Sequence, residues 1–577
     1  TPCFLVYKGE IYLKKRLLAL TLCAAMLVSA VLTGCQNGGT TESNNSVASN
    51  TESAASSSSD SSIPEDGGFK TISYEASKDK YRNYYEIFVY SFCDSDGDGI
   101  GDFKGLTSKL DYLNDGDPKT TDDLGIDGIW LMPIMPSGSY HKYDVDNYKD
   151  IDKSYGTLED FKTFLSEAHK RGINVIIDFV INHTSNTNEW FKKAKEELKE
   201  GKTDGYAQYY NFVQSDSKPA DVGASKYYYA GTKGWYYESA FTQNMPDLNL
   251  KNEKVRKEIE GICDFWLKDI GIDGFRLDAA YHYDQNSNES INDIKWLYDY
   301  CKSIKDDVYM VGEVWMGGNV ISDFYKSGAD SFFNFDMQGT SGQVATKAVN
   351  LKNVKGYYDY VKSWVDTITE NNSKAISAPF ISNHDTARSA GFLTRNTQKE
   401  KNAAMAYLLT PGNPFIYYGE EIGMTGSGED PDKRTGMVWS LSDNTGYVAS
   451  IPGATTNTEK PEEGVAEAQK NENSLLNLYK KVIRLKLQNP EIARGTFTPV
   501  TLDENNKAVG AFISEYNGSK VMVILNLSDK ATVTVPKSAM SYSGVRGYIV
   551  SDTTNTEKVE LNGEQLTIPA NSVVVLK

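Results

Sequence analysis

From Tyr84 onward the chain repeats one pattern of positions: a short apolar run, a polar loop, and an amphipathic stretch with helical spacing. Apolar runs rich in β-branched and aromatic residues predict strands at 85–92, 128–133, 175–180, 274–279, 308–315, 332–337, 379–384 and 415–418. Helical spacing occurs at 158–171, 255–270, 354–369, 400–409 and 475–487. These alternating units predict an α/β fold, a (β/α)8 TIM barrel over residues 71–490. A doubly wound open sheet is the alternative, but no glycine-rich phosphate turn follows the first run.

One connection is too long for a simple loop. About seventy residues separate the third predicted strand from the next helical stretch, and loops of that length are functional or form small domains. Eleven aromatic residues lie between Tyr206 and Phe241. We expect an inserted subdomain over residues 183–249, in which some of these aromatics form a small core and others line a cleft against the barrel.

After Pro490 the pattern changes to short alternating strands. The runs 509–516 and 520–527 flank Asn517-Gly518, a pair typical of a tight hairpin turn. Further strand patterns occur at 531–535 and 572–576. Residues 491–577 are therefore expected to form a C-terminal antiparallel β-sandwich.

The N-terminal segment carries a targeting pattern. Lys14, Lys15 and Arg16 precede an apolar stretch that ends at Gly34-Cys35, which is typical of a bacterial lipoprotein signal peptide over residues 1–35 with lipidation at Cys35. A signal anchor is the alternative, since the apolar stretch is near the lower limit for spanning a membrane. Residues 36–70 are rich in Ser, Thr and Asn and predict a disordered tether. The expected location is extracytoplasmic, on the bacterial cell surface and anchored to the membrane by lipid.

The charge and composition of the chain limit the kinds of molecule that it is expected to bind. The net charge is −18, and an acidic surface repels phosphate backbones, so nucleic acid is not expected as a partner. Aromatic residues make up 12%, including 37 Tyr, which suits a protein that stacks against sugar rings. The six cysteines form no framework, and Cys93 and Cys263 lie in apolar runs typical of buried thiols. We expect a monomer.

Reactive side chains gather at the ends of predicted strands. The third predicted strand contains Asp178 near its end and is followed by Asn182-His183. Three later predicted strands end in reactive side chains, at Arg276-Leu-Asp278, Gly312-Glu313 and Asn383-His384-Asp385. The carboxyl ends of barrel strands meet at one mouth, where TIM barrels carry out catalysis. One such acid could be a helix cap, but four reactive strand ends are difficult to explain as structure alone.

The spacing within these segments predicts roles for two carboxylates. Arg276 and Asp278 are two residues apart, so their side chains share one face of a strand. A neighbouring cation favours the ionised carboxylate that a nucleophile requires. Glu313, on the adjacent strand, would then retain a proton and act as general acid. Retaining glycosidases place such a pair about 5–5.5 Å apart.

These segments together resemble the conserved regions of glycoside hydrolase family 13, the α-amylase family. The resemblance runs from about Tyr84 to the C-terminus. It implies Asp278 as nucleophile, Glu313 as acid/base and Asp385 as the group that stabilises the distorted sugar. It also implies that the substrate-binding residues are Tyr143, which stacks on the sugar, and His183, Arg276 and His384, which hydrogen-bond to it.

Finer features indicate a subgroup of the family. The segment QNMPDLN at 243–249 resembles that of intermediary α-amylases. Ala279 follows the nucleophile, where α-1,6-preferring relatives tend to carry Val, and Tyr140 stands where exo-acting α-glucosidases tend to have Asp. The resemblance therefore implies a retaining, endo-acting hydrolase of α-1,4 bonds in starch and maltooligosaccharides. Tyr281, where many α-amylases have Lys, leaves contacts on the leaving-group side open.

Three other interpretations stay open at this point. Two use the same site: an α-glucosidase or oligo-1,6-glucosidase, and a glucan transglycosylase. The third belongs to another class, a non-catalytic surface glucan-binding protein on the same scaffold.

A glycine-rich acidic loop follows the first predicted strand. Carboxylates stand at alternate positions, the spacing with which hard oxygen ligands surround Ca²⁺. The expected ligands are Asp94, Asp96, Asp98, the carbonyl of Ile100, and Asp102. Gly105 stands where an EF-hand would require Glu. The family resemblance supports a structural calcium ion here, and an ordinary acidic turn is the alternative.

Overall fold

The computed structural model describes residues 63–455 and 460–577. The expected signal peptide, the Cys35 lipidation site and the tether up to residue 62 lie outside the described residues. Within the described part, no helix is both long enough and apolar enough to span a bilayer.

Residues 63–70, which the sequence assigns to the tether, instead belong to the folded body. Phe69 is buried, and its carbonyl oxygen accepts a hydrogen bond from Arg484 Nε at 2.8 Å. The backbone N–H of Tyr548 donates to the carbonyl of Gly67. The prediction of disorder up to residue 70 is wrong because this segment contributes a large apolar side chain to the core.

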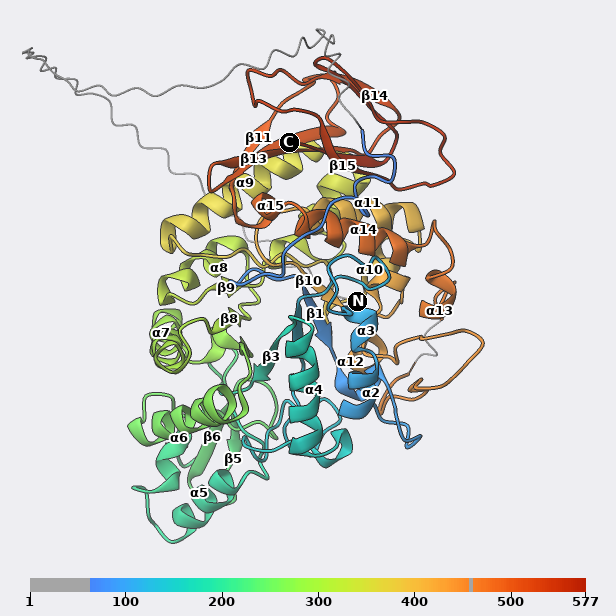
Figure 1. The fold of residues 1–577 in the computed structure, drawn as a ribbon. Helices are drawn as coiled ribbons and strands as arrows, with labels where there is room; N and C mark the ends of the chain where they lie inside the picture. Colours follow the sequence, from blue (N-terminus) through green and yellow to red (C-terminus); the bar gives the residue numbers. More distant parts are fainter. Residues whose placement is uncertain (1–62, 456–459) are drawn as a thin grey trace, which may run out of the picture. The chain divides into compact units, whose positions relative to one another are not determined.

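A parallel sheet forms the centre of the fold (Figure 1). Its order is β10-β1-β2-β3-β7-β8-β9. The strands are β1 (Tyr84–Ile87), β2 (Gly128–Leu131), β3 (Asn174–Phe179), β7 (Gly274–Leu277), β8 (Tyr309–Gly312), β9 (Ser331–Phe332) and β10 (Phe415–Tyr417). Parallel bridges from Phe333 to Ala378 and from Phe380 to Phe415 close the ring. The result is the predicted TIM barrel, in which the seventh expected strand is reduced to these two bridges.

Two other predicted strands give way to helix before their expected ends. The first ends at Ile87, and its apolar continuation forms helix α1 (Val89–Phe92). The sixth ends at Phe332 and is followed by a short helical turn, η6 (Phe335–Met337). The apolar side chains of both stretches stay buried in these short helices, so apolar periodicity alone does not distinguish strand from helix here.

Helices surround the barrel and follow the predicted amphipathic stretches. Those expected from the sequence are α4 (Leu158–Lys170), α6 (Glu253–Cys263), α9 (Val354–Asn371), α11 (Thr397–Leu408) and α14 (Leu475–Leu487). The others are α2 (Phe103–Ser108), α3 (Leu110–Leu113), α5 (Glu189–Lys199), α7 (Ser287–Ile304), α8 (Gly318–Phe324), α10 (Ser389–Phe392), α12 (Asp430–Lys433), α13 (Val465–Ala468) and α15 (Pro490–Arg494). Thr157 and Asp160 form a capping box that fixes the start of α4.

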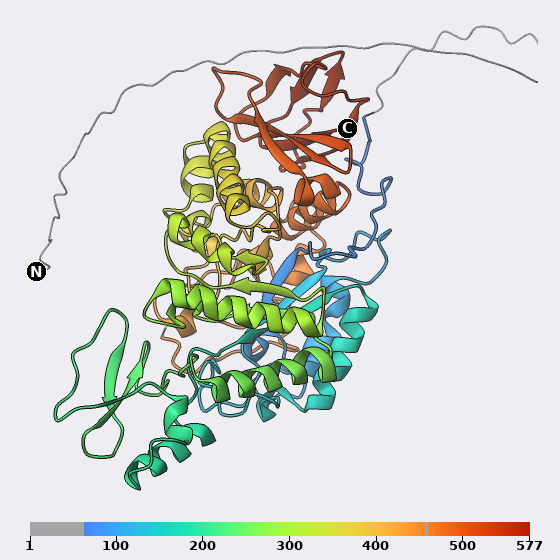
Figure 2. The same cartoon turned by 90° about the vertical axis from the view of Figure 1, so that its left-hand side faces the viewer.

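The long connection after β3 forms an inserted subdomain. Its antiparallel strands are β4 (Phe212–Gln214), β5 (Lys226–Tyr229) and β6 (Trp235–Ser239), in the order β4-β6-β5. Phe191 of α5 packs against Tyr210, Phe212 and Tyr237 in a small aromatic core. Figure 2 shows this subdomain at the end of the barrel opposite the C-terminal strands. Part of the predicted aromatic cluster is therefore structural.

The C-terminal part consists of two antiparallel sheets. The larger has the order β11-β12-β13-β18-β15, and the smaller β14-β17-β16. Their bounds are β11 (Thr496–Val500), β12 (Val509–Tyr516), β13 (Ser519–Asn526), β14 (Ala531–Thr534), β15 (Val545–Val550), β16 (Glu560–Asn562), β17 (Gln565–Ile568) and β18 (Ser572–Leu576). Asn517 and Gly518 both have positive φ, as the predicted hairpin turn requires.

Candidate active site

The reactive side chains predicted from the sequence meet at the carboxyl ends of the barrel strands. Asp178 lies in β3 and Arg276 in β7, while Asp278 and Glu313 directly follow β7 and β8. Asp385 follows the bridges that close the barrel. Adjacent parallel strands end at the same edge, which is why residues distant in sequence converge here.

Arg276 is the centre of the carboxylate cluster. Its guanidinium is fully buried, and Nη1 donates to Asp178 Oδ1 and Asp278 Oδ1, both at 2.7 Å. Nη2 lies 3.1 Å from Glu313 Oε2, which also accepts from the backbone N–H of Ala279 at 3.0 Å. One guanidinium thus spans Asp278 and Glu313, an arrangement compatible with the close spacing of a retaining pair.

The electrostatics of this cluster correct one expectation from the sequence. Burial raises the pKa of Asp278 above its ordinary value; Arg276 opposes the shift, and Glu313 and Asp178 add to it. Burial likewise raises the pKa of Asp178 to about 6 despite Arg276. Arg276 therefore favours the ionised form of Asp278, as predicted, but burial and the two neighbouring carboxylates oppose it in the free site.

Asp385 has a different environment. Its Oδ1 lies 2.6 Å from Arg434 Nη2, and its Oδ2 lies 2.9 Å from His384 Nε2. Burial favours the neutral acid, but His384 and Arg434 outweigh burial and lower the pKa of Asp385 well below its ordinary value. Asp385 is therefore the anion of the site, suited to stabilise developing positive charge.

His384 carries the matching positive charge. Burial alone would lower its pKa, but Asp385 and Glu86 raise the pKa of His384 to about 9. Its Nδ1 lies 2.5 Å from Glu86 Oε1. The imidazolium therefore donates at both nitrogens and fixes the orientation of Asp385.

The predicted sugar-binding residues complete the pocket. The Tyr143 hydroxyl donates to Asp178 Oδ2 at 3.0 Å and lies 2.7 Å from His384 Nε2. Burial lowers the pKa of His183 to about 4, so its imidazole is neutral at physiological pH. His183 Nε2 is buried and has no hydrogen-bond partner among the described residues. It is therefore free to bind a substrate hydroxyl.

Comparison with known proteins identifies the family. Residues 86–495 match the model of the α-amylase catalytic domain. The chain belongs to the α-amylase family. It is 38% identical to α-amylase 3 of Dictyoglomus thermophilum over 78% of this chain and 85% of that protein. The structure of Amy13B of Eubacterium rectale is 41% identical, with a TM-score of 0.79 over 88% of this chain and 98% of that one. An oligo-1,6-glucosidase of Parageobacillus thermoglucosidasius is 29% identical over 78% of this chain and 90% of that protein.

These relatives support a glycoside hydrolase of the α-amylase family, and the non-catalytic interpretation gains no support. The carboxylates open into a pocket of about 640 Å³, which His183 and Tyr143 also line. Apolar side chains extend its rim: Trp315 is 50% exposed and stacks on Phe335 at 5.1 Å, and Phe241 is 38% exposed. The cleft of this α-amylase relative therefore offers aromatic surface beyond the carboxylates.

Three residues of the active site were not among the catalytic and substrate-binding residues predicted from the sequence. The sequence places Asp178 at a strand end but predicts no role for it, although its carboxylate binds Arg276 and Tyr143. Glu86 is a buried carboxylate within the apolar strand β1, a signal that could have been noticed. Arg434 directly follows the four-residue helix α12, outside every predicted periodic stretch, so spacing could not have identified it.

The acidic loop after α1 brings together three of its predicted ligands. Oxygen atoms of Asp94, Asp96 and Asp102 lie within 4.8 Å of one another. Asp98 is not in this cluster; its Oδ1 instead accepts from the backbone N–H of Ile100 at 2.8 Å. Within the described residues, none of the three clustered carboxylates pairs with Lys or Arg. Hard oxygen donors without a protein counterion fit a cation such as Ca²⁺.

Proposed function

We propose that this protein is a retaining, endo-acting hydrolase of α-1,4-glucosidic bonds in starch and maltooligosaccharides. The observation that carries the proposal is the bridging of Asp278 and Glu313 by the single guanidinium of Arg276. A retaining mechanism requires a nucleophile and an acid/base close together.

In the proposed mechanism, each residue of the site has one role. Asp278 attacks the anomeric carbon while the glycosidic C–O bond breaks and Glu313 gives its proton to the leaving oxygen. Water then attacks the glycosyl-enzyme ester and passes a proton to Glu313, which releases Asp278 and an α-configured product. Asp385, held anionic by Arg434 and His384, stabilises the positive charge that develops on the sugar.

Three features favour endo cleavage of α-1,4 bonds. Tyr140 occupies the position where exo-acting α-glucosidases of the family tend to carry Asp, and its hydroxyl accepts from Arg434 Nη1 at 3.2 Å. Trp315 and Phe241 provide apolar surface at the rim, onto which further glucose units would stack. Ala279 after the nucleophile favours α-1,4 over α-1,6 specificity by resemblance.

Relatives named oligo-1,6-glucosidase make exo-acting or α-1,6-specific hydrolysis the second candidate. Timed product analysis from maltoheptaose and isomaltose separates the two. We expect mixed maltooligosaccharides from maltoheptaose and little attack on isomaltose. Glucose as the sole early product, or rapid isomaltose hydrolysis, would favour the second candidate. Accumulation of products longer than maltoheptaose would indicate a transglycosylase.

We also propose that Asp94, Asp96 and Asp102 hold a structural Ca²⁺ ion. The convergence of their oxygens supports this role, and hard carboxylate donors match the preference of Ca²⁺. The ion would tie the first βα loop to the start of α2, where Asp102 accepts from the N–H of Gly105.

For location, we propose lipid attachment at Cys35, which would place the enzyme on the outer face of the bacterial membrane with its substrate. The basic and apolar residues before Cys35 support this proposal. Mass spectrometry of the N-terminal peptide from membrane fractions tests it. A diacylglycerol-modified Cys35 is expected, and an unmodified N-terminal peptide in the soluble fraction would contradict it.

A further inference from the structure

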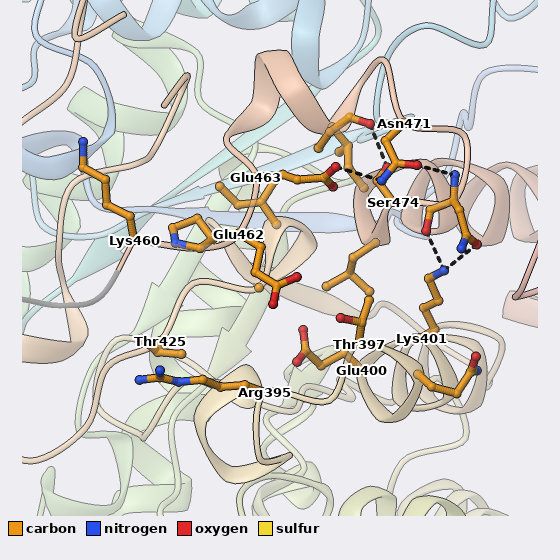
Figure 3. Close-up of a pocket in the computed structure, with 18 of the residues that line it drawn as sticks. Arg395, Thr397, Glu400, Lys401, Thr425, Lys460, Glu462, Glu463, Asn471 and Ser474 are labelled. Carbon is orange, nitrogen blue, oxygen red and sulfur yellow. Dashed lines mark hydrogen bonds between the residues drawn. The ribbon is translucent and has the colours of Figure 1, made fainter. Parts of the chain in front are cut away.

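A second cavity lies outside the active site, between the start of α11 and the loop that leads to α13. Its volume is about 690 Å³. Figure 3 shows two carboxylates in it, those of Glu400 from α11 and Glu462 from the loop, directed toward the same space. Neither residue takes part in the proposed catalytic mechanism.

Glu400 is unusual because its side chain is largely buried while its carboxylate has no partner among the described residues. The residue is 7% exposed. Among the described residues, no hydrogen bond or ion pair to its carboxylate is found. The carboxylate of Glu400 lies against Gly423, because a Cβ atom added at this glycine would be 3.1 Å from Glu400 Oε2. An unpaired buried carboxylate is costly and normally has a counterion or retains a proton.

The basic side chains around this cavity do not supply the counterion. Lys401 Nζ donates to Asn473 Oδ1 and to the carbonyl of Ser551, both at 2.9 Å. Lys460 Nζ lies 4.6 Å from the ring centroid of Tyr447. In Figure 3 the side chain of Arg395 extends past Thr425, away from Glu400. The two carboxylates are thus left facing each other.

We propose that Glu400 and Glu462 bind a divalent cation, Ca²⁺, at a site separate from the acidic loop after α1. Carboxylate oxygens are hard donors, and Ca²⁺ accepts irregular shells completed by water, which this open cavity admits. Thr397 lies one helical turn before Glu400 on the same face of α11 and offers a hydroxyl oxygen as a further donor. The bound ion would fasten the loop that carries Glu462 to the barrel helix.

Proton and cation would compete for this site. Burial, together with Glu462, raises the pKa of Glu400 to about 7. Asp552 and Glu463, the other acids that line the cavity, have hydrogen-bond partners in Thr554 and Asn471. Ca²⁺ affinity should therefore be higher at pH 8 than at pH 6, because the cation must displace the proton at the lower pH.

Calorimetric titration of CaCl₂ into EDTA-stripped protein tests the proposal. All variants carry Asp96→Asn, which is expected to weaken Ca²⁺ binding at the acidic loop after α1. We expect Ca²⁺ binding to persist there and to weaken at least about tenfold when Glu400→Gln or Glu462→Gln is added. Glu463→Gln is the matched control from the same loop, since its carboxylate is held by Asn471 Nδ2 at 2.8 Å, and should bind normally.

Two results would overturn the proposal. One is Ca²⁺ affinity unchanged by both Glu400→Gln and Glu462→Gln. The other is no binding at pH 8 in the Asp96→Asn background, which would mean that the pair holds a proton alone. Because Glu462 is exposed, Glu462→Gln should fold normally and keeps the test informative if Glu400→Gln does not.

Discussion

Single residues in the active site differ sharply in charge although they share one pocket. Asp385 faces two cations, His384 and Arg434, and its pKa is lowered. Asp278 shares Arg276 with two other carboxylates, and burial raises its pKa. The surroundings therefore favour the anionic form of Asp385 more strongly than that of Asp278. A firmly anionic Asp385 suits the role of stabilising the positive charge that develops on the sugar.

Replacing Glu313 should affect natural and activated substrates differently. Glu313→Gln should lower hydrolysis of maltoheptaose by about 10²–10⁴-fold, because the leaving oxygen then receives no proton. The first turnover of a glucosyl fluoride, whose leaving group needs no proton, should be much less affected in a rapid-mixing burst measurement. Glu196→Gln on the exposed face of α5 is the control. Equal loss of both first turnovers would refute the acid assignment.

The buried pair of His384 and Glu86 should give stability a defined pH dependence. Since the pKa of His384 is raised to about 9, its contribution is complete below about pH 6.5, the unfolded value, and is lost as pH rises toward 9. Glu86→Gln should reduce the free energy of unfolding at pH 7 by about 3 kcal/mol. Chemical denaturation at several pH values should also give a flatter profile between pH 7 and 9. An unchanged slope in the variant would contradict this explanation.

The barrel's strands and five of the helices around it were predictable from the sequence, because these segments carry clear periodicity. Helix α14 and strands β12 and β18 have the bounds expected from the pattern. The two strands that end earlier than predicted and continue as helix share one cause. The apolar runs after Ile87 and Phe332 leave the sheet but stay buried, so only tertiary packing decides their conformation.

The prediction of the active site was also incomplete, because some of its contacts depend on tertiary folding. Strand ends revealed Asp278, Glu313 and Asp385, because barrel topology brings them together. Arg434 lies in an irregular loop, and its contact with Asp385 depends on folding that no local pattern encodes.

The acidic loop gives a prediction at the level of the βα element. EDTA should lower the melting temperature, since an ion bound only by the folded state stabilises it. Asp96→Asn should lower the melting temperature similarly and remove most of the EDTA effect. Asp98→Asn is the matched control, because Asp98 lies outside the cluster, and should keep the effect. Differential scanning fluorimetry checks this, and equal behaviour of the two variants would contradict the ligand set.

In the whole molecule, one hydrophobic core joins the barrel to the larger C-terminal sheet. Tyr358 of α9 packs on Phe497 and Phe512 at 5.9 and 5.1 Å between ring centroids. Gly510 of β12 lies so close to Val354 that a Cβ there would be 2.5 Å from its Cγ1. The barrel and the C-terminal sheets should therefore unfold as one cooperative unit.

Differential scanning calorimetry of the Tyr358→Ala variant tests whether the two parts unfold cooperatively. The variant should lose about 3–5 kcal/mol of unfolding free energy from the lost ring, while still unfolding in a single transition. Tyr358→Phe keeps the ring and should remain close to the unmodified protein. Two separate heat-absorption peaks in the unmodified protein would show that the shared core does not couple the two parts.

The most direct test of the proposed mechanism is mass spectrometry of the enzyme after reaction with a fluorinated glucosyl fluoride that slows deglycosylation. The mechanism predicts a covalent label on one peptide, attached to Asp278, because its neighbour Glu313 can assist both departure of the leaving group and attack by water. A label on Asp385 would mean that the two carboxylates have been exchanged. No label at all, together with β-configured products by NMR, would contradict the retaining mechanism.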